Sequence, residues 1–248
     1  MAPLLRSRRP ASALDDAALR ATWQVASLLI DYPEESQPLD LVEQTVAQLP
    51  AAVRDPLTRF LEHRRLTPLG ELQADYVETF DTRRRCTLFL TYFLHGDTRK
   101  RGMALLRFKQ TYLGAGLELD ETELPDHLAV VLEFAATADL AQGRTLLLDH
   151  RAGLELLRLS LSDLGSPYAD VVTAVCAGLP PVSGDDLELV AKRAAAGPPD
   201  EEVGLTPYGA PGFDAALVDP TYRRSGQPAP VDLGLPAMPS TAATGRGA

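Results

Sequence analysis

The chain has few of the residues from which catalytic and metal sites are commonly built. Its 248 residues include two cysteines, four histidines and one tryptophan. Cys86 and Cys176 lie far apart and form no Cys-x-x-Cys pair, so the spacing of zinc ligands is missing. Neither thiol has a resolving cysteine nearby, and we interpret both as free, buried thiols in a reducing compartment.

Several sequence motifs are also missing. The chain has no adjacent His-Asp pair, which a helical metal-dependent phosphohydrolase would use. It has no phosphate-binding Gly-x-x-x-x-Gly-Lys-Ser/Thr loop and no Gly-x-Ser-x-Gly elbow. No apolar run approaches the roughly 18 residues of a membrane span. We therefore expect a protein that is not an enzyme, holds no metal or cofactor and does not cross a membrane.

The chain has fewer basic than acidic residues, which gives a formal net charge of -10 at pH 7. This balance argues against nucleic-acid binding, whose electrostatic signature is basic. It suits a protein that meets a basic partner segment.

The N-terminus contains Ser-Arg-Arg at residues 7–9, as twin-arginine export signals do. An export signal continues into an apolar stretch, whereas Asp15 and Asp16 follow here. We expect residues 1–11 to be a disordered leader and the protein to be cytoplasmic.

What the chain does have is apolar residues at helical spacing, interrupted by proline and glycine. No stretch alternates in the manner of a strand. The pattern predicts an all-α fold, a single multi-helix bundle. The expected helices cover residues 12–32, 39–49, 56–65, 68–80, 86–94, 98–113, 125–140, 145–164 and 168–177.

The same pattern predicts the domain organisation. Residues 12–180 are expected to form one all-helical domain, and residues 181–196 a possible short helix. Proline, glycine, alanine and acidic residues dominate residues 197–248. Such a composition buries too little apolar surface to offset chain entropy, so we expect a disordered tail.

Aromatic residues, scarce elsewhere, gather between residues 76 and 108. Tyr76 and Phe80 are four residues apart and share one face of a helix. Tyr92 and His95 share a face of the next expected helix. Two interpretations of the three aromatic residues stay open: they line an apolar groove for a client helix, or they pack in the core.

A basic run follows at the start of another expected helix. Gly96 ends one helix and Asp97 caps the next, which carries Arg99, Lys100 and Arg101 in its first turns. Cations at that end oppose the helix dipole. The run is therefore either a positive patch with a use or a solvated helix end.

These segments resemble a known family. The motifs are Tyr-Val-Glu-Thr-Phe-Asp at residues 76–81, Leu-Thr-Tyr at 90–92 and His-Gly-Asp-Thr-Arg-Lys-Arg-Gly-Met-Ala-Leu at 95–105. Leu-Pro-Asp-His-Leu follows at 124–128, with Leu-Glu-Phe at 132–134. Together they resemble the delta-subunit (NarJ-type) assembly chaperones of respiratory nitrate reductase, within the wider TorD-like family of all-helical maturation chaperones. The resemblance covers roughly residues 20–180.

The resemblance implies a chaperone that binds the N-terminal segment of the nitrate reductase catalytic (alpha) subunit. It would keep that subunit competent for molybdenum cofactor insertion before membrane docking. A helical adaptor or scaffold for another redox-enzyme client is the alternative.

The second motif suggests how a client would be bound. Asp126 and His127 are expected at the start of a helix, where they serve either as cap and packing residue or as part of a binding site. In the second case Asp126 accepts charge-assisted hydrogen bonds from a peptide Arg or Lys, with Glu133 along the same face. The expected client-binding residues are Tyr76, Phe80, Tyr92, His95, Asp97, Arg99, Arg101, Asp126, His127 and Glu133.

Overall fold

The structure, a computed structural model, describes residues 14–96, 98–119, 123–182, 184, 188 and 190. The expected leader, the tail and most of the possible helix at 181–196 therefore lie outside the described residues. Within the described ranges the fold is all-α, as predicted, and the β structure amounts to one isolated bridge between Phe89 and His127. The helices are α1 (Asp16–Ile30), α2 (Leu39–Ala47), α3 (Ala51–Leu66), α4 (Leu69–Tyr76), α5 (Tyr92–His95), α6 (Arg99–Gly114), α7 (Leu128–Thr137), α8 (Leu140–Asp149), α9 (Arg151–Asp163) and α10 (Tyr168–Ala177).

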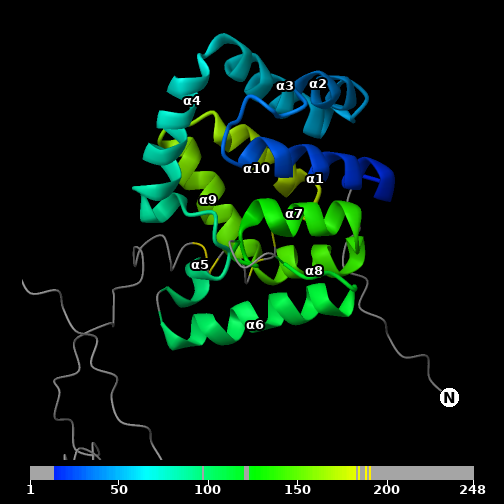
Figure 1. Cartoon of the computed structure of the whole chain (residues 1–248), viewed down its shortest axis with the longest axis vertical. Coiled ribbons are helices and arrows are strands. Elements are labelled where there is room, and N and C mark those ends of the chain that lie inside the picture. Colours follow the sequence, from blue (N-terminus) through cyan, green and yellow to red (C-terminus); the bar gives the residue numbers. More distant parts are fainter. Residues whose placement is uncertain are drawn as a thin grey trace, which may run out of the picture. The chain divides into compact units, whose positions relative to one another are not determined.

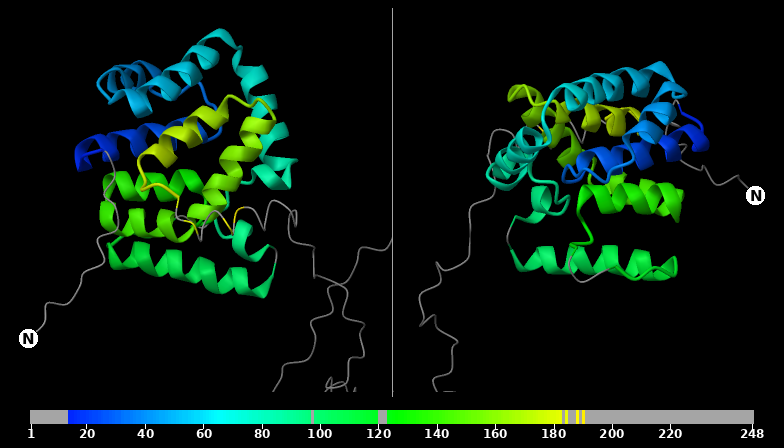
Figure 2. Two further views of the ribbon diagram at one scale, coloured as in Figure 1. Left: turned by 180° about the vertical axis from the view of Figure 1, so that it is seen from behind. Right: turned by 45° about the horizontal axis from the view of Figure 1, so that its top comes forward.

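Helices α1 and α10 make the most extensive contacts with other helices. Helix α1 packs against α7 on one side and against α10 on the other, and α10 also contacts α3 and α9. Helix α8 packs on α7, and α6 lies beyond it at the lower edge of Figure 1. The two views of Figure 2 keep α6 at this outer position.

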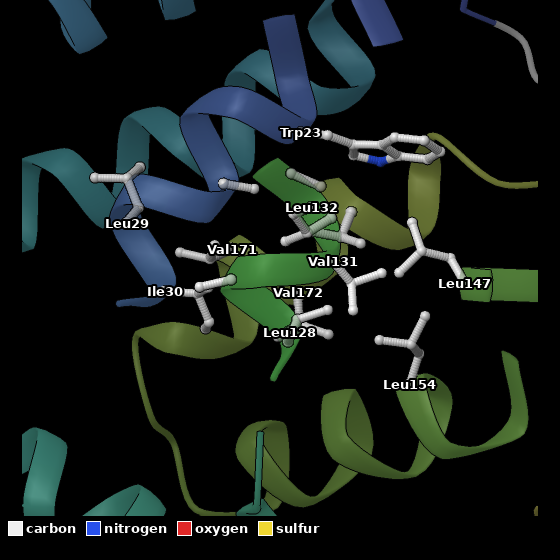
Figure 3. Packing of buried hydrophobic residues seen from close by; sticks show 14 of the residues in the cluster. Trp23, Leu29, Ile30, Leu128, Val131, Leu132, Leu147, Leu154, Val171 and Val172 are labelled. Atoms are coloured by element: carbon white, nitrogen blue, oxygen red, sulfur yellow. The ribbon is translucent and has the colours of Figure 1, made fainter. Parts of the chain in front are cut away.

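The core is built where α1, α7, α9 and α10 meet. Trp23 of α1 is fully buried among the neighbouring helices. Figure 3 shows Leu128, Val131 and Leu132 of α7 among the side chains that fill this space. A Cβ atom at Gly178 would lie 2.6 Å from Leu19 Cδ1, which explains a glycine where the end of α10 crosses α1.

Two expected helix starts are wrong. Helix α3 begins at Ala51, directly after Pro50, rather than at Pro56. Pro56 lies in its second turn, where the missing N–H forfeits one backbone bond without ending the helix. Helix α7 begins at Leu128 rather than Pro125, because residues 125 and 126 form a turn.

The α-helix expected at 86–94 does not form over residues 86–91. Residues 84–86 form a single 3-10 turn, η2 (Arg84–Cys86), and a helix resumes only with the four residues of α5. Between them the backbone pairs with the segment before α7: Leu90 N–H donates to Asp126 C=O at 3.0 Å, and Leu128 N–H donates to Leu88 C=O at 2.9 Å. Tertiary pairing of the backbone therefore replaces the local helix.

The long helix expected at 145–164 is two helices, α8 and α9. They meet at His150, whose backbone leaves the helical region at φ -111° and ψ 19°. The imidazole Nδ1 of His150 lies 2.9 Å from Leu146 C=O and stands in for a backbone partner at the end of α8. Helix α4 continues as a π-helical turn, η1 (Val77–Asp81), where an α-helix was expected as far as Phe80.

Candidate functional site

Asp126 joins the turn before α7 to the segment before α5. Its side chain is 0% exposed. Oδ2 accepts hydrogen bonds from Thr91 N–H at 3.1 Å and from Thr91 Oγ1 at 2.5 Å. The guanidinium of Arg101 on α6 lies 3.9 Å from the same oxygen. We call these three residues, Asp126, Thr91 and Arg101, the clasp, because they tie three segments together.

Of the two roles that the sequence left open for Asp126, its burial favours the packing role over direct contact with a client. The carboxylate is enclosed by the fold, whereas Glu133 is exposed on α7, so the two residues do not share a face. Oδ1 of Asp126 has no hydrogen-bond partner within the described part of the chain. The geometry gives Asp126 a positioning role between segments.

Two aromatic residues pack around the clasp. The Arg101 guanidinium lies over the rings of Phe89, at 5.4 Å, and Tyr92, at 5.9 Å. Its Nε donates to Thr91 Oγ1 at 3.2 Å. His127 is half-buried against Phe89, and burial lowers the pKa of its imidazole although nearby carboxylates raise it. The structure thus brings four of the expected site residues together: Tyr92, Arg101, Asp126 and His127.

Tyr76 and Phe80 belong to a different cluster. Both are buried, and their rings lie 5.9 Å and 4.9 Å from the ring of Tyr168 on α10. Phe60 of α3 completes the cluster at 5.0 Å from Tyr168. The sequence left open whether Tyr76 and Phe80 line a groove for a client helix or pack in the core. These contacts support core packing. The π-helical turn places both rings inward, and such turns are frequent at functional sites.

Exposed apolar surface covers this cluster. Tyr32, at the end of α1, is 40% exposed and lies edge-on to Tyr76, with ring centroids 5.4 Å apart. Val77, the first residue of η1, is 42% exposed. We call Tyr32 and Val77 the apolar patch.

Three exposed carboxylates lie within electrostatic reach of Tyr76, beside the apolar patch. Burial is the main cause that raises the pKa of Tyr76, and the carboxylates of Asp31, Asp81 and Glu123 raise it further. Asp31 and Glu123 also raise the pKa of His127, so they lie within electrostatic reach of both clusters. In the part of the chain that the structure describes, none of the three forms an ion pair. We call Asp31, Asp81 and Glu123 the acidic rim.

The remaining expected residues lie near the junction of α5 and α6. His95 is half-buried at the end of α5, and its C=O accepts from Thr98 Oγ1 at 2.8 Å. Arg99 is exposed in the first turn of α6. Asp97 lies outside the described residues.

Sequence reasoning missed the acidic rim and Tyr32. The helix expected at residues 12–32 includes Tyr32, although Tyr32 stands directly before Pro33, where a helix must end. An aromatic residue beyond the last turn is released from the buried face. The signal for Asp31 and Tyr32 was therefore present, but the approach of Glu123 could not be read from spacing.

Among the described residues, no group of three His, Cys, Asp or Glu side chains is placed to hold a metal ion. The described helices also include none that is both long and apolar enough to cross a membrane.

The fold and motifs agree with comparisons with known proteins. The family described as nitrate reductase delta subunit matches residues 46–174. The chain belongs to this family. The probable nitrate reductase molybdenum cofactor assembly chaperone NarJ of Bacillus subtilis is 31% identical over 163 residues, which cover 64% of this chain and 88% of that protein. The NarJ chaperone of Escherichia coli is 34% identical over 152 residues, covering 58% of this chain and 64% of that protein.

A longer relative contains the same family region. The nitrate reductase-like protein NarX of Mycobacterium tuberculosis is 44% identical over 155 residues, which cover 62% of this chain. The chain spans about a quarter of the length of NarX, 24%. A crystal structure described as a putative redox enzyme maturation protein from Archaeoglobus fulgidus has the same fold, with a TM-score of 0.50 and 23% identity over 69% of this chain and 97% of that one.

Proposed function

We propose that this protein is an assembly chaperone for respiratory nitrate reductase. It binds the N-terminal segment of the catalytic subunit and keeps that subunit competent for molybdenum cofactor insertion before membrane docking. The observation that carries the proposal is family membership, together with relatives named as assembly chaperones that match most of the helical domain.

The apolar patch and the acidic rim supply a docking surface for such a segment. Tyr32 and Val77 offer apolar area beside three carboxylates. An amphipathic helix with an apolar face and flanking Lys or Arg residues complements this surface in both shape and charge. The client segment is therefore expected to bind as a basic, amphipathic helix.

The clasp supports this surface from within. The turn that carries Asp126 begins only two residues after Glu123, and its backbone is fixed to residues 88–90. Loss of the buried carboxylate would release the turn and displace Glu123 from the rim. In this proposal Asp31 and Glu123 contact the client directly. Asp126 does not contact the client but holds the turn that positions Glu123.

The test is titration calorimetry with a synthetic peptide of the client's N-terminal segment. Asp31→Asn with Glu123→Gln removes two rim charges without loss of volume. Affinity should fall about five- to thirtyfold at low salt, since an exposed ion pair contributes up to about 1 kcal/mol. Asp40→Asn with Glu35→Gln makes the same charge change at exposed positions elsewhere and should leave affinity nearly unchanged.

Salt separates contact from long-range attraction. At high ionic strength the gap between wild type and the rim variant should shrink, because exposed charges are screened. Equal loss in the rim and control variants would remove the rim from the site. A wild-type protein that ignores this peptide and captures another redox enzyme's leader would favour the adaptor function instead.

A further inference from the structure

Helix α6 is held to the rest of the molecule by one narrow face. Phe108 and Tyr112 are its buried side chains among the described residues. The Phe108 ring lies 5.2 Å from the imidazole of His150, and the Tyr112 ring lies 4.7 Å from that of Phe134. Tyr112 also donates its hydroxyl hydrogen to Pro125 C=O at 2.6 Å. These contacts fix which face of α6 turns outward.

The outward face carries an apolar stripe. Met103 is 70% exposed, Leu113 is 57% exposed and Leu106 is 45% exposed. At 3.6 residues per turn the three side chains fall within an arc of about 80°. We call Met103, Leu106 and Leu113 the α6 stripe.

Cations border the stripe on both sides. Lys100 lies about 60° beyond Met103 around the helix, and Lys109 lies about 40° beyond Leu113 in the opposite direction. Both lysines are exposed, as is Arg99. No acidic residue occurs between residues 98 and 117, although the whole chain has a net charge of -10. Helix α6, the lowest helix in the view of Figure 1, therefore carries positive charge and no negative charge.

From this arrangement we infer that the α6 stripe is a docking face for an anionic lipid surface. A helix that lies in a membrane interface buries an apolar face to a shallow depth, while Lys and Arg at its flanks meet anionic headgroups. The molecule's charge asymmetry turns α6 toward such a surface and its acidic remainder away. The proposal is independent of client binding at the acidic rim.

The composition of the face favours lipid over a protein partner. Protein interfaces are enriched in aromatic residues, Met and Arg and depleted in Lys, so the discriminating residues are the aromatics and the lysines. Here the aromatic residues of α6 point inward, and the outward face presents Met, Leu, Lys and Arg. Long aliphatic stems of the flanking lysines reach the headgroups while their ammonium groups stay hydrated.

The experiment is co-sedimentation of the full chain with vesicles. One set is phosphatidylcholine alone, and the other is phosphatidylcholine mixed with phosphatidylglycerol. We expect binding to the mixed vesicles and little to phosphatidylcholine, with loss of binding as salt increases. No binding to the mixed vesicles, or equal binding to both sets, would overturn the inference.

Matched variants locate the contact. Met103→Ser with Leu113→Ser should lower vesicle binding by roughly tenfold, since the apolar stripe is removed. Leu41→Ser with Leu66→Ser changes two comparably exposed leucines elsewhere and should bind as the wild type does. Because all four side chains are exposed, each variant is expected to keep its circular dichroism spectrum and thermal midpoint. Equal losses in the two pairs would overturn the inference.

A second pair of variants tests the role of the lysines in the same way. Lys100→Gln with Lys109→Gln should weaken binding about tenfold or more. Arg84→Gln with Arg85→Gln removes the same charge from other exposed positions and should have a much smaller effect. If sedimentation instead shows a concentration-dependent dimer that the stripe variants abolish, with no vesicle binding, the face is an interface between copies and the lipid assignment is wrong.

Discussion

Burial separates the roles of chemically similar residues in this protein. Asp126 and Glu133 are seven residues apart and both acidic, but one is enclosed and bonded to Thr91 while the other is exposed. The buried, hydrogen-bonded carboxylate of Asp126 is therefore expected to stabilise the fold, whereas the exposed carboxylate of Glu133 is not.

The first prediction follows from this contrast. Asp126→Ala leaves Thr91 N–H and Oγ1 without their acceptor and removes the anion beside Arg101, so the unfolding free energy should fall by about 2 to 4 kcal/mol. Glu133→Ala should change it by less than about 0.5 kcal/mol. Urea denaturation followed by circular dichroism measures both. Similar values for the two variants would show that the clasp does not stabilise the fold.

A second prediction concerns two buried tyrosines. The Tyr112 hydroxyl donates to Pro125 C=O, whereas the Tyr168 hydroxyl has no hydrogen-bond partner among the described residues. Tyr112→Phe should therefore lower the unfolding free energy by about 1 to 2 kcal/mol, and Tyr168→Phe should be neutral or stabilising. The two variants are compared in one denaturant series. A clear loss for Tyr168→Phe would reveal a partner for its hydroxyl.

At the scale of elements, helix pairs depend on a few close approaches and breaks. Helices α7 and α8 touch at Gly143, where a Cβ atom would lie 2.3 Å from Ala135 Cβ. Helices α8 and α9 are separated at His150, whose ring is buried against Phe108 of α6. Both positions control how α8 is placed.

The third prediction is that Gly143→Ala forces α7 and α8 apart. The overlap involves backbone as well as side-chain atoms of Ala135, so the unfolding free energy should fall by roughly 3 kcal/mol. Gly102→Ala in α6 meets nothing within 4 Å and should stabilise by about 0.5 to 1 kcal/mol. Thermal unfolding of both variants tests this. If Gly143→Ala does not lower the unfolding free energy, the two helices can move apart without loss of stability.

A fourth prediction concerns pH. Burial is the main cause that lowers the pKa of His150 below its ordinary value of 6.5. Protonation therefore favours the unfolded chain: the contribution is fully present above about pH 6.5 and is lost as pH falls below it. The loss should be at most about 1.4 kcal/mol per pH unit for each such histidine.

Urea unfolding between about pH 7.5 and pH 5.5 measures this dependence. His150→Gln, which cannot titrate, should give a flatter pH profile than the wild type, whatever its own stability. His127, whose pKa burial also lowers, is expected to leave part of the slope in place. An unchanged profile in His150→Gln would assign the dependence to other groups.

At the scale of the whole molecule, client binding and stability are linked. A peptide that binds the folded domain but not the unfolded chain stabilises it by about 2.7 kcal/mol at a hundred times its dissociation constant. The fifth prediction is a rise of roughly 5 to 10 °C in the thermal midpoint at that concentration. Scanning calorimetry with the client peptide and a scrambled control checks it. An equal shift with the scrambled peptide would indicate non-specific binding.

The sequence by itself determined the fold class. Apolar spacing and the prolines located α2, α6 and α10 closely, because their boundaries are set by local rules of periodicity and chain interruption. The motifs at residues 76–81 and 124–128 were sufficient to indicate the family. The family match over residues 46–174 confirms it.

Tertiary structure decided the rest. Residues 86–91 have helical spacing, but their backbone pairs with residues 126–128, a contact between segments more than thirty residues apart. The same pairing buries Asp126, whose role as a cap or as a binding residue spacing alone had left open. Asp31 and Glu123 approach Tyr76 only because α1, η1 and the turn before α7 converge. Periodicity reports which face of one helix is apolar, whereas burial and charge at a site depend on which other elements cover that face.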